Sequence, residues 1–226
     1  ITFRLYKKFQ KSLKDEKMIN IYEVFEKPLL KILAYMEIEG VKIDNKFLKS
    51  LSTKFEKKIV KIQNEVFKIS KKEFNIASPK QLGEILYNDL KIADLKKTKK
   101  GSFATSASVL EDLAFKGHKF PQLVLDWRQV SKLKNTYSDS LPEHINPNTQ
   151  RVHTSFLLAA TTTGRLASSD PNLQNIPIKS EDGKDIRKAF IAKKDHVLIS
   201  ADYNQIEMRI LADLADVKAV SYTHLR

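Results

Sequence analysis

The chain has 226 residues, of which 42% are hydrophobic and 30% charged, and this ordinary globular composition excludes a disordered or collagen-like protein. No apolar run reaches the roughly 18 residues that a membrane span needs, and the first residues lack the apolar core of a signal peptide, so we expect a soluble cytoplasmic protein. The absence of cysteine excludes disulfides and thiolate zinc sites, while the net charge of +13 suggests a polyanionic partner, nucleic acid first. A lysine-heavy composition from an AT-rich genome would give the same charge without selection for binding.

The N-terminal part predicts two helices. Residues 1–25 are typical of a basic helix that ends in a hydrophobic segment, and because they begin without a methionine or a capping residue, the chain looks cut at its start. Pro28 opens a second helix that Gly40 ends, and residues 41–43 follow as a short extended link.

A long amphipathic helix is predicted from Asp44 onward, because apolar residues recur there every three or four positions. They are Leu48, Leu51, Phe55, Ile59, Ile62, Val66 and Ile69. The lysines between them form an outer face, which we interpret mainly as a solvated surface.

Two short helices and a lysine-dense loop follow. Ser78 begins a capping box with proline at the first helical position, which predicts a helix to about Asn88, and Ser108 begins another that stops near Gly117. The loop between them carries Lys96, Lys97, Lys99 and Lys100. Such a loop suits phosphate contacts, which position a protein without reading sequence. The residues before 151 hold 29 Lys and Arg against 18 Asp and Glu, so most of the excess charge lies in this part.

Pro121 begins a longer helix whose apolar stripe runs through Trp127 to Tyr137 and breaks before Pro142. We interpret Trp127 as a core residue more readily than as a platform for base stacking. After Pro147 the pattern changes to β-favouring residues at 151–161, a buried strand at 196–201 and a helix at 205–215. The predicted fold class is therefore mainly α with a smaller α/β (α+β) part.

The segment TTTGRLASSDPNLQNIP, residues 161–177, is dense in side chains that hydrogen-bond but cannot pack. One Arg, two Asn and one Gln at fixed spacing can hold phosphates and base edges, although an elaborate surface loop would look the same. Downstream, Asp202 ends the predicted strand and Glu207 lies on the next helix. Asp202 could bind a divalent cation such as Mg²⁺, but Asn204 with Glu207 is also a capping box.

These two segments, TTTGRLASSDPNLQNIP and SADYNQIEMR, resemble in order and separation two signature segments of family A DNA polymerases of the bacterial DNA polymerase I type. EGVKID, NIASPKQLGEIL, WRQVSKLKNTY, INPNTQRVHTSF and IRKAFIA resemble the same family in the same order. The resemblance covers about residues 1–219. It implies the end of a 3′-5′ exonuclease domain at 1–27, a helical thumb at 28–140, and part of the palm with a few antiparallel strands at 141–219.

The resemblance also implies roles for residues. Asp202 resembles the first metal-binding catalytic aspartate, and the Tyr203 carbonyl would complete a site for two Mg²⁺ ions that bridge to the dNTP. Glu207 matches the steric gate that disfavours a 2′-hydroxyl, with Gln205 beside it near the nucleotide. Arg165 resembles the minor-groove reader at the primer terminus. The further implied contacts to primer-template DNA are Asn172, Gln174 and Asn175 in the loop and Arg128, Lys132 and Lys134 on the thumb helix.

Some family features are missing from the sequence. The fingers and the second catalytic aspartate would follow, and the exonuclease carboxylates would precede Ile1, so we expect this chain alone not to polymerise. Asn204 stands where the family usually has Ser and is expected to cap the helix. Residues 220–226, VSYTHLR, do not resemble the family but resemble a translated sequencing adapter, and we expect them to be an assembly artefact.

The alternative function is a non-catalytic nucleic-acid-binding module. A phage polymerase of the same family is a weaker third possibility, and no feature of the sequence indicates an oligomer.

Overall fold

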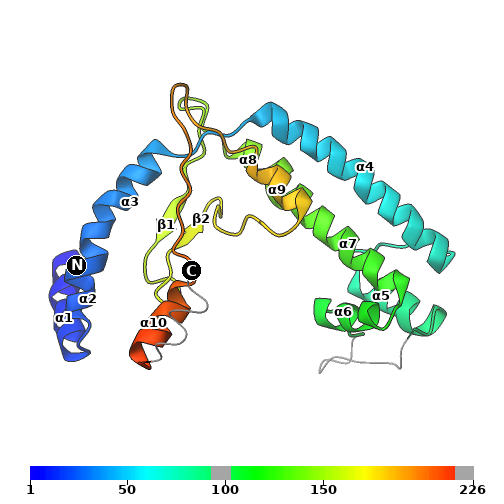
Figure 1. Ribbon diagram of the computed structural model, residues 1–226, viewed down its shortest axis with the longest axis horizontal. Coiled ribbons are helices and arrows are strands. Elements are labelled where there is room, and N and C mark those ends of the chain that lie inside the picture. Colours follow the sequence, from blue (N-terminus) through cyan, green and yellow to red (C-terminus); the bar gives the residue numbers. More distant parts are fainter. Residues whose placement is uncertain (93–102, 217–226) are drawn as a thin grey trace. The chain divides into compact units, whose positions relative to one another are not determined.

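The computed structural model describes residues 1–92 and 103–216 and divides into two compact units, Ile1–Ile191 and Ala192–Arg226. The described fold is mainly helical with a two-stranded antiparallel sheet, which confirms the predicted fold class (Figure 1). None of the described helices is both long enough and apolar enough to cross a membrane. The lysines at 96–100 and the segment 220–226 lie outside the described residues, so the predictions made for them stay predictions.

The first unit begins with helices. They are α1 (Thr2–Asp15), α2 (Ile19–Ile21), the π-helical turn η1 (Tyr22–Glu26) and α3 (Lys27–Glu39). Gly40 ends α3 as predicted, with φ at +64°. A Cβ at this position would lie 2.7 Å from both His153 Nδ1 and the Val152 carbonyl oxygen, so only glycine fits.

The centre of the first unit is a group of packed helices. It contains α4 (Asn45–Ser70), α5 (Pro79–Gly83), η2 (Glu84–Asp89), α6 (Ala107–Phe115), α7 (Lys119–Leu133), η3 (Lys134–Asp139) and α8 (Ser140–Glu143). The predicted cap of α5 is confirmed, because Ser78 accepts from the Gln81 N–H. Asp44, where the long helix was expected to begin, caps α4 by accepting from the Phe47 N–H. The predicted start of α6 is wrong by two residues, since Ser106 is the N-cap residue.

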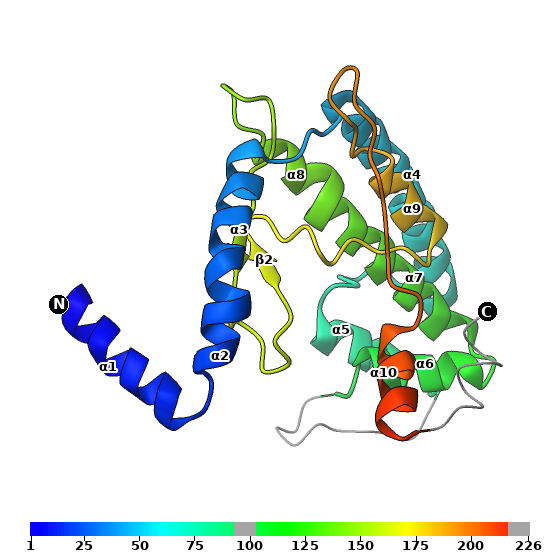
Figure 2. The same cartoon turned by 60° about the vertical axis from the view of Figure 1, so that its left-hand side comes forward.

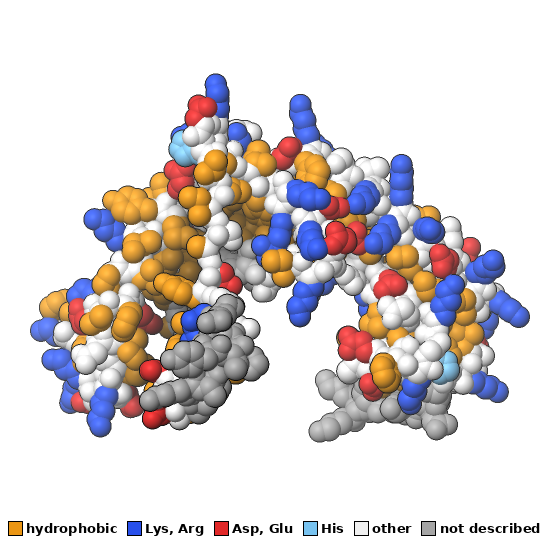
Figure 3. Space-filling model, viewed as in Figure 1, with side chains coloured by type: hydrophobic (Ala, Val, Ile, Leu, Met, Phe, Trp, Pro, Cys, Tyr) orange, Lys and Arg blue, Asp and Glu red, His pale blue; other side chains and the backbone are white. Residues whose placement is uncertain are grey.

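The helices α4 and α7 run side by side in both ribbon views (Figures 1 and 2). The hydrophobic core includes buried side chains of both helices. The predicted seam of α4 is confirmed: Leu48 and Phe55 are fully buried, and Ile59 packs against the same core from a partly buried position. Val130 and Leu133 bury the facing side of α7. Burying an apolar side chain of this size stabilises the fold by about 1.5–3 kcal/mol. The charged residues of α4 are its lysines together with Glu56 and Glu65. Blue basic side chains, with acidic ones among them, gather on the molecular surface in this region (Figure 3).

The link between α3 and α4 is extended, as predicted, and pairs with segments far along the chain. Val41 and Val152 exchange backbone hydrogen bonds of 2.8 and 2.9 Å, and Ile43 forms a bridge with Phe190. The sheet consists of β1 (Ser155–Leu157) and β2 (Ala167–Ser169), with Phe156 opposite Ser168. The loop from β2 leads to α9 (Glu181–Arg187).

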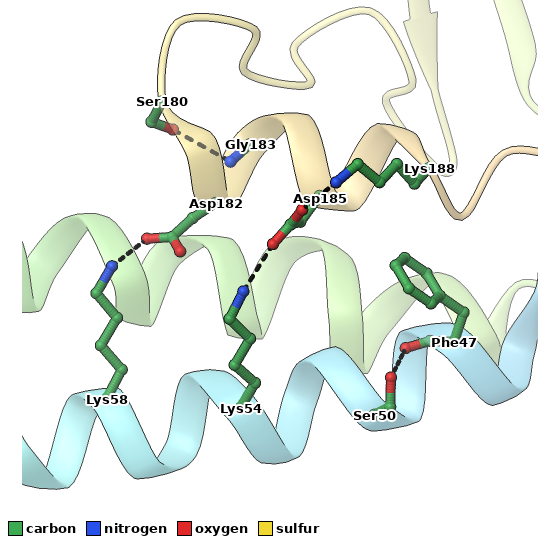
Figure 4. Close-up of polar contacts among 9 residues, drawn as sticks. All are labelled: Phe47, Ser50, Lys54, Lys58, Ser180, Asp182, Gly183, Asp185 and Lys188. Carbon is green, nitrogen blue, oxygen red and sulfur yellow. Dashed lines mark hydrogen bonds and ion pairs between the residues drawn. The ribbon is translucent and has the colours of Figure 1, made fainter.

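Ion pairs hold α9 against α4 (Figure 4). Lys54 Nζ lies 2.7 Å from Asp185 Oδ2, and Lys58 Nζ lies 2.5 Å from Asp182 Oδ2. Lys188 also pairs with Asp185, at 2.7 Å. Since α9 contacts α7 as well, these pairs fix its place beside both long helices of the unit.

The second unit contains α10 (Ile206–Leu214), close to the predicted helix. Two predictions for this unit are wrong. Residues 197–199 are not a buried strand, because their side chains are 78%, 64% and 87% exposed. Among the described residues no segment pairs with their backbone, and a strand requires such pairing. Asn204 does not cap α10: the N-cap residue is Gln205, at φ 48° and without a side-chain capping bond, while the Asn204 carbonyl accepts from Arg209 Nε.

We expect the α9 ion pairs to make stability depend on pH. Hydrogen bonds from Lys188 and Lys54 lower the pKa of the Asp185 carboxyl, so the ionised carboxylate stabilises the folded chain. This stabilisation is complete above the unfolded aspartate pKa of about 3.9 and is lost as the pH falls through the lower folded pKa. The melting temperature of Asp185→Asn should lie about 1–3 °C below that of the unchanged chain at neutral pH, and this gap should close as the pH is lowered from neutral through the folded-state pKa of Asp185.

The control is Asp112→Asn, which changes an exposed carboxylate on α6 and should shift the melting temperature less at neutral pH. A gap for Asp185→Asn that stayed constant across this pH range would contradict the role given to the ion pairs.

Candidate functional site

A cleft of about 720 Å³ opens in the first unit between α6 and α7 on one side and residues 175–180 on the other. Arg128, Lys132 and Lys179 give its lining three basic side chains, and Glu111 and Asp126 give two acidic ones. The predicted thumb helix and the predicted polar loop, far apart in the sequence, therefore form two walls of the same cleft.

Arg128 has a fixed orientation in this wall. Its Nη1 donates to the Thr105 carbonyl at 2.8 Å, and partial burial lowers the pKa of the guanidinium. This bond uses one of the five N–H donors of the guanidinium group.

Lys132 and Lys134 differ although both were predicted as contacts to nucleic acid. Lys132 is exposed and lines the cleft. Lys134 lies 2.7 Å from Asp139 and 3.2 Å from Glu56 of α4, and its side chain is 18% exposed. The hydrogen bond to Asp139 raises the pKa of Lys134. Lys134 thus helps to hold η3 against α4. Its position does not support the predicted contact with DNA.

The polar loop after β2 uses part of its predicted side chains to hold its own shape. Asn172 Oδ1 accepts from the Gln174 N–H at 2.9 Å, and Gln174 Nε2 donates to the Leu166 carbonyl at 2.9 Å. Asn175 lines the cleft. Among these amides, Asn175 is therefore placed best to meet a ligand there.

Arg165 lies on the turn between β1 and β2, and its side chain is exposed. The Thr161 hydroxyl closes this turn, accepting from the Arg165 N–H at 2.9 Å and donating to the Arg165 carbonyl at 3.0 Å. Gly164 supplies the positive φ, +71°, that the turn needs.

The predicted metal-binding segment belongs to the second unit, whereas the residues that line the cleft belong to the first. Asp202 and Tyr203 are exposed there, and Glu207 lies in the first turn of α10, where a carboxylate interacts favourably with the helix dipole. The Asp202 carboxylate and the Tyr203 carbonyl are donors that Mg²⁺ accepts, but Mg²⁺ takes about six ligands. Within residues 1–92 and 103–216, no group of three or more His, Asp or Glu side chains is arranged so that it could hold a metal ion. Asp202 and the Tyr203 carbonyl alone therefore supply only part of the ligands that Mg²⁺ needs.

Lys179, Gln129 and Tyr137 line the cleft but were not predicted as site residues. Lys179 follows the signature loop in the sequence. Gln129 is next to Arg128 and lies one helical turn before Lys132 on α7. Residues three apart share a helix face, so this spacing could have indicated that Gln129 faces the same cleft as Lys132. Tyr137 was assigned to the apolar stripe, and the sequence carries no signal of what its hydroxyl contacts.

The model of the DNA polymerase family A matches residues 45–223. The chain belongs to DNA polymerase family A. DNA polymerase I of Rhizobium leguminosarum is 48% identical over 217 residues, which are 96% of this chain and 21% of that protein. DNA polymerase I of Caldicellulosiruptor bescii is 48% identical over 196 residues, 87% of this chain and 23% of that protein. The chain thus spans between a fifth and a quarter of the length of these family A relatives.

A solved family A structure has the same fold. It is the POL domain of Pol1 from M. smegmatis in complex with DNA primer-template and dNTP, with a TM-score of 0.81 and 36% sequence identity. The match covers 92% of this chain and 36% of that one. The predicted family is therefore confirmed, while the roles of individual residues stay predictions.

Proposed function

We propose that the chain is part of a DNA-directed DNA polymerase, which transfers nucleotides from dNTPs to a primer 3′-hydroxyl in DNA replication and repair. The observation that carries this proposal is the cleft, which places Arg128, Lys132 and Lys179 beside Asn175 in a chain whose solved relative holds DNA primer-template. A polymerase that acts on bacterial chromosomal DNA would work in the cytoplasm.

In this proposal residues 1–27 end a 3′-5′ exonuclease domain, 28–140 form the thumb and 141–219 form part of the palm. The packing of α4 on α7 supports the thumb as a rigid helical body. The short β1–β2 sheet supports the start of a different subdomain after α8.

The cleft would bind the duplex mainly through its backbone. Lys132 and Lys179 are long, exposed cations suited to phosphate contacts, which position a protein on DNA without reading its sequence. Asn175 and Arg165 offer planar donors to the minor groove, where correct base pairs present similar acceptors. Such contacts check the geometry of a base pair and tolerate any sequence, as a polymerase requires.

The exposed segment 202–207 would face the nucleotide in the complete enzyme. Asp202 and the Tyr203 carbonyl would contribute two oxygen ligands to Mg²⁺, whose chemistry when bound is to stabilise the charge of the transferring phosphate. Gln205 would lie near the dNTP, and Glu207 would exclude a 2′-hydroxyl from the sugar site.

A non-catalytic nucleic-acid-binding module is the second candidate for this chain alone. The observation that favours it is that the described residues contain no group of three or more His, Asp or Glu side chains that could hold a metal ion. Primer-extension assays of the 226-residue chain beside the complete enzyme separate the two: DNA binding without extension supports the module, and extension by the chain alone contradicts it.

We expect Asp202→Asn in the complete enzyme to lower the rate of nucleotide incorporation by more than about 100-fold. A loss of about 100-fold is the upper value for a residue that only hydrogen-bonds a metal ligand, and a direct ligand should cost more. Its melting temperature should barely change, because Asp202 is exposed. Glu207→Ala should instead increase incorporation of ribonucleotides relative to deoxyribonucleotides, since it opens space beside the sugar. Single-nucleotide incorporation kinetics with matched deoxy and ribo substrates measure both effects.

The matched control is Asp213→Asn, which removes an exposed carboxylate from the same helix, α10, and should leave incorporation unchanged. Near-normal incorporation by Asp202→Asn would refute its assignment as a ligand, and unchanged sugar discrimination in Glu207→Ala would refute the gate.

Substitution of Lys132 should affect DNA binding, whereas substitution of Lys134 should affect stability. Lys132→Gln should weaken primer-template binding and reduce the slope of log affinity against log salt by about one, because one phosphate contact is lost. Lys134→Gln should lower the melting temperature and leave that slope unchanged, because its charge is held by Asp139 and Glu56. Fluorescence anisotropy at several salt concentrations and melting curves measure the difference. Equal slopes for both variants would count against the cleft as the DNA site.

A further inference from the structure

The loop that forms one wall of the cleft is held by its backbone. Three consecutive carbonyls accept hydrogen bonds from helical side chains: Tyr137 Oη donates to Asn175, Arg187 Nη2 to Ile176 at 3.1 Å, and Arg187 Nε to Pro177 at 3.3 Å. We call Tyr137 and Arg187 the anchors of this loop. Because both contact its main chain, the side chain of Asn175 stays available to line the cleft.

The two anchors come from different helices. Arg187 belongs to α9, which ion pairs fix to α4. Tyr137 belongs to η3, which continues α7, the helix that carries Arg128 and Lys132. The bond from Tyr137 to Asn175 therefore joins one wall of the cleft directly to the other, across 38 residues of sequence.

Tyr137 is suited to a fixed contact. It is 3% exposed, and burial raises the pKa of its phenol, so the hydroxyl stays protonated and able to donate at neutral pH. A tyrosine also has few rotatable bonds, so a buried ring holds its hydroxyl in one place.

We propose that Tyr137 is a positioning residue for DNA, whose hydroxyl fixes the Asn175 carbonyl and thereby sets where residues 174–179 meet the duplex. The proposal rests on the proposed function, because it gives the loop a DNA ligand. It goes beyond that function by giving Tyr137, through its bond to the loop backbone, a role in where the DNA binds. A merely structural role would make Tyr137 matter for stability alone.

The test is Tyr137→Phe in the 226-residue chain, with Tyr87→Phe as the matched control. Tyr87 is 5% exposed, its hydroxyl donates to the Ala104 carbonyl at 2.8 Å, and burial raises its pKa too. Both variants lose one buried hydrogen bond to a carbonyl, so their melting temperatures should fall by similar amounts.

Two readouts should distinguish them. Hydrogen exchange of the peptide covering residues 172–179 should become faster in Tyr137→Phe and not in Tyr87→Phe. The dissociation constant for primer-template DNA should rise about three- to tenfold in Tyr137→Phe, with an unchanged salt slope because no charge is removed. Equal exchange rates and affinities in the two variants would overturn the proposal.

A double-mutant cycle with Asn175→Ala supplies the sharper test. If Tyr137 acts through the loop, the double variant should bind DNA about as weakly as the weaker single variant. Losses that simply multiply would overturn the positioning role. Failure of the unchanged chain to bind primer-template DNA would count against the proposed function, whereas binding that Tyr137→Phe does not alter would count against the positioning role alone.

Discussion

The packing of α4 along α7 is the constraint on which the candidate site depends. The shared apolar core makes the two helices one body, so the face of α7 that points away from it is fixed in space. Arg128 and Lys132 lie on the cleft side of α7 for this reason. The same body holds α9 through ion pairs, and α9 in turn holds the loop that closes the cleft. A change that loosened this core would therefore displace both walls together.

The lysines of this molecule have two roles, which the net charge of the chain does not distinguish. Lys54, Lys58 and Lys134 pair with carboxylates that join helices, whereas Lys132 and Lys179 line the cleft. Exposed ion pairs contribute little individually, about 0–1 kcal/mol, but several in one contact fix an orientation. The large positive excess therefore overstates the number of lysines available to DNA.

The sequence predicted what depends on local pattern. The seam from Leu48 to Ile69 repeats at helical spacing, so α4 could be placed closely, and Ser78 marked a cap because its partner lies three residues away. The strand predicted at 196–201 does not form, because a strand forms only against a partner, which no apolar run specifies. Long-range contacts could not be predicted from the sequence either. The Tyr137 hydroxyl donates to a backbone carbonyl 38 residues later. Because every residue has such a carbonyl, the sequence does not indicate which one the hydroxyl contacts.

We propose that primer-template DNA binds in the cleft between α7 and residues 175–180. Lysine acetylation of the 226-residue chain with and without DNA, mapped by mass spectrometry, measures this directly, because a bound phosphate backbone shields the lysines it contacts. DNA should protect Lys132 and Lys179 and leave the reactivity of Lys54 and Lys58, on the α4–α9 contact, unchanged. Protection of Lys54 and Lys58 without protection of Lys132 and Lys179 would contradict it.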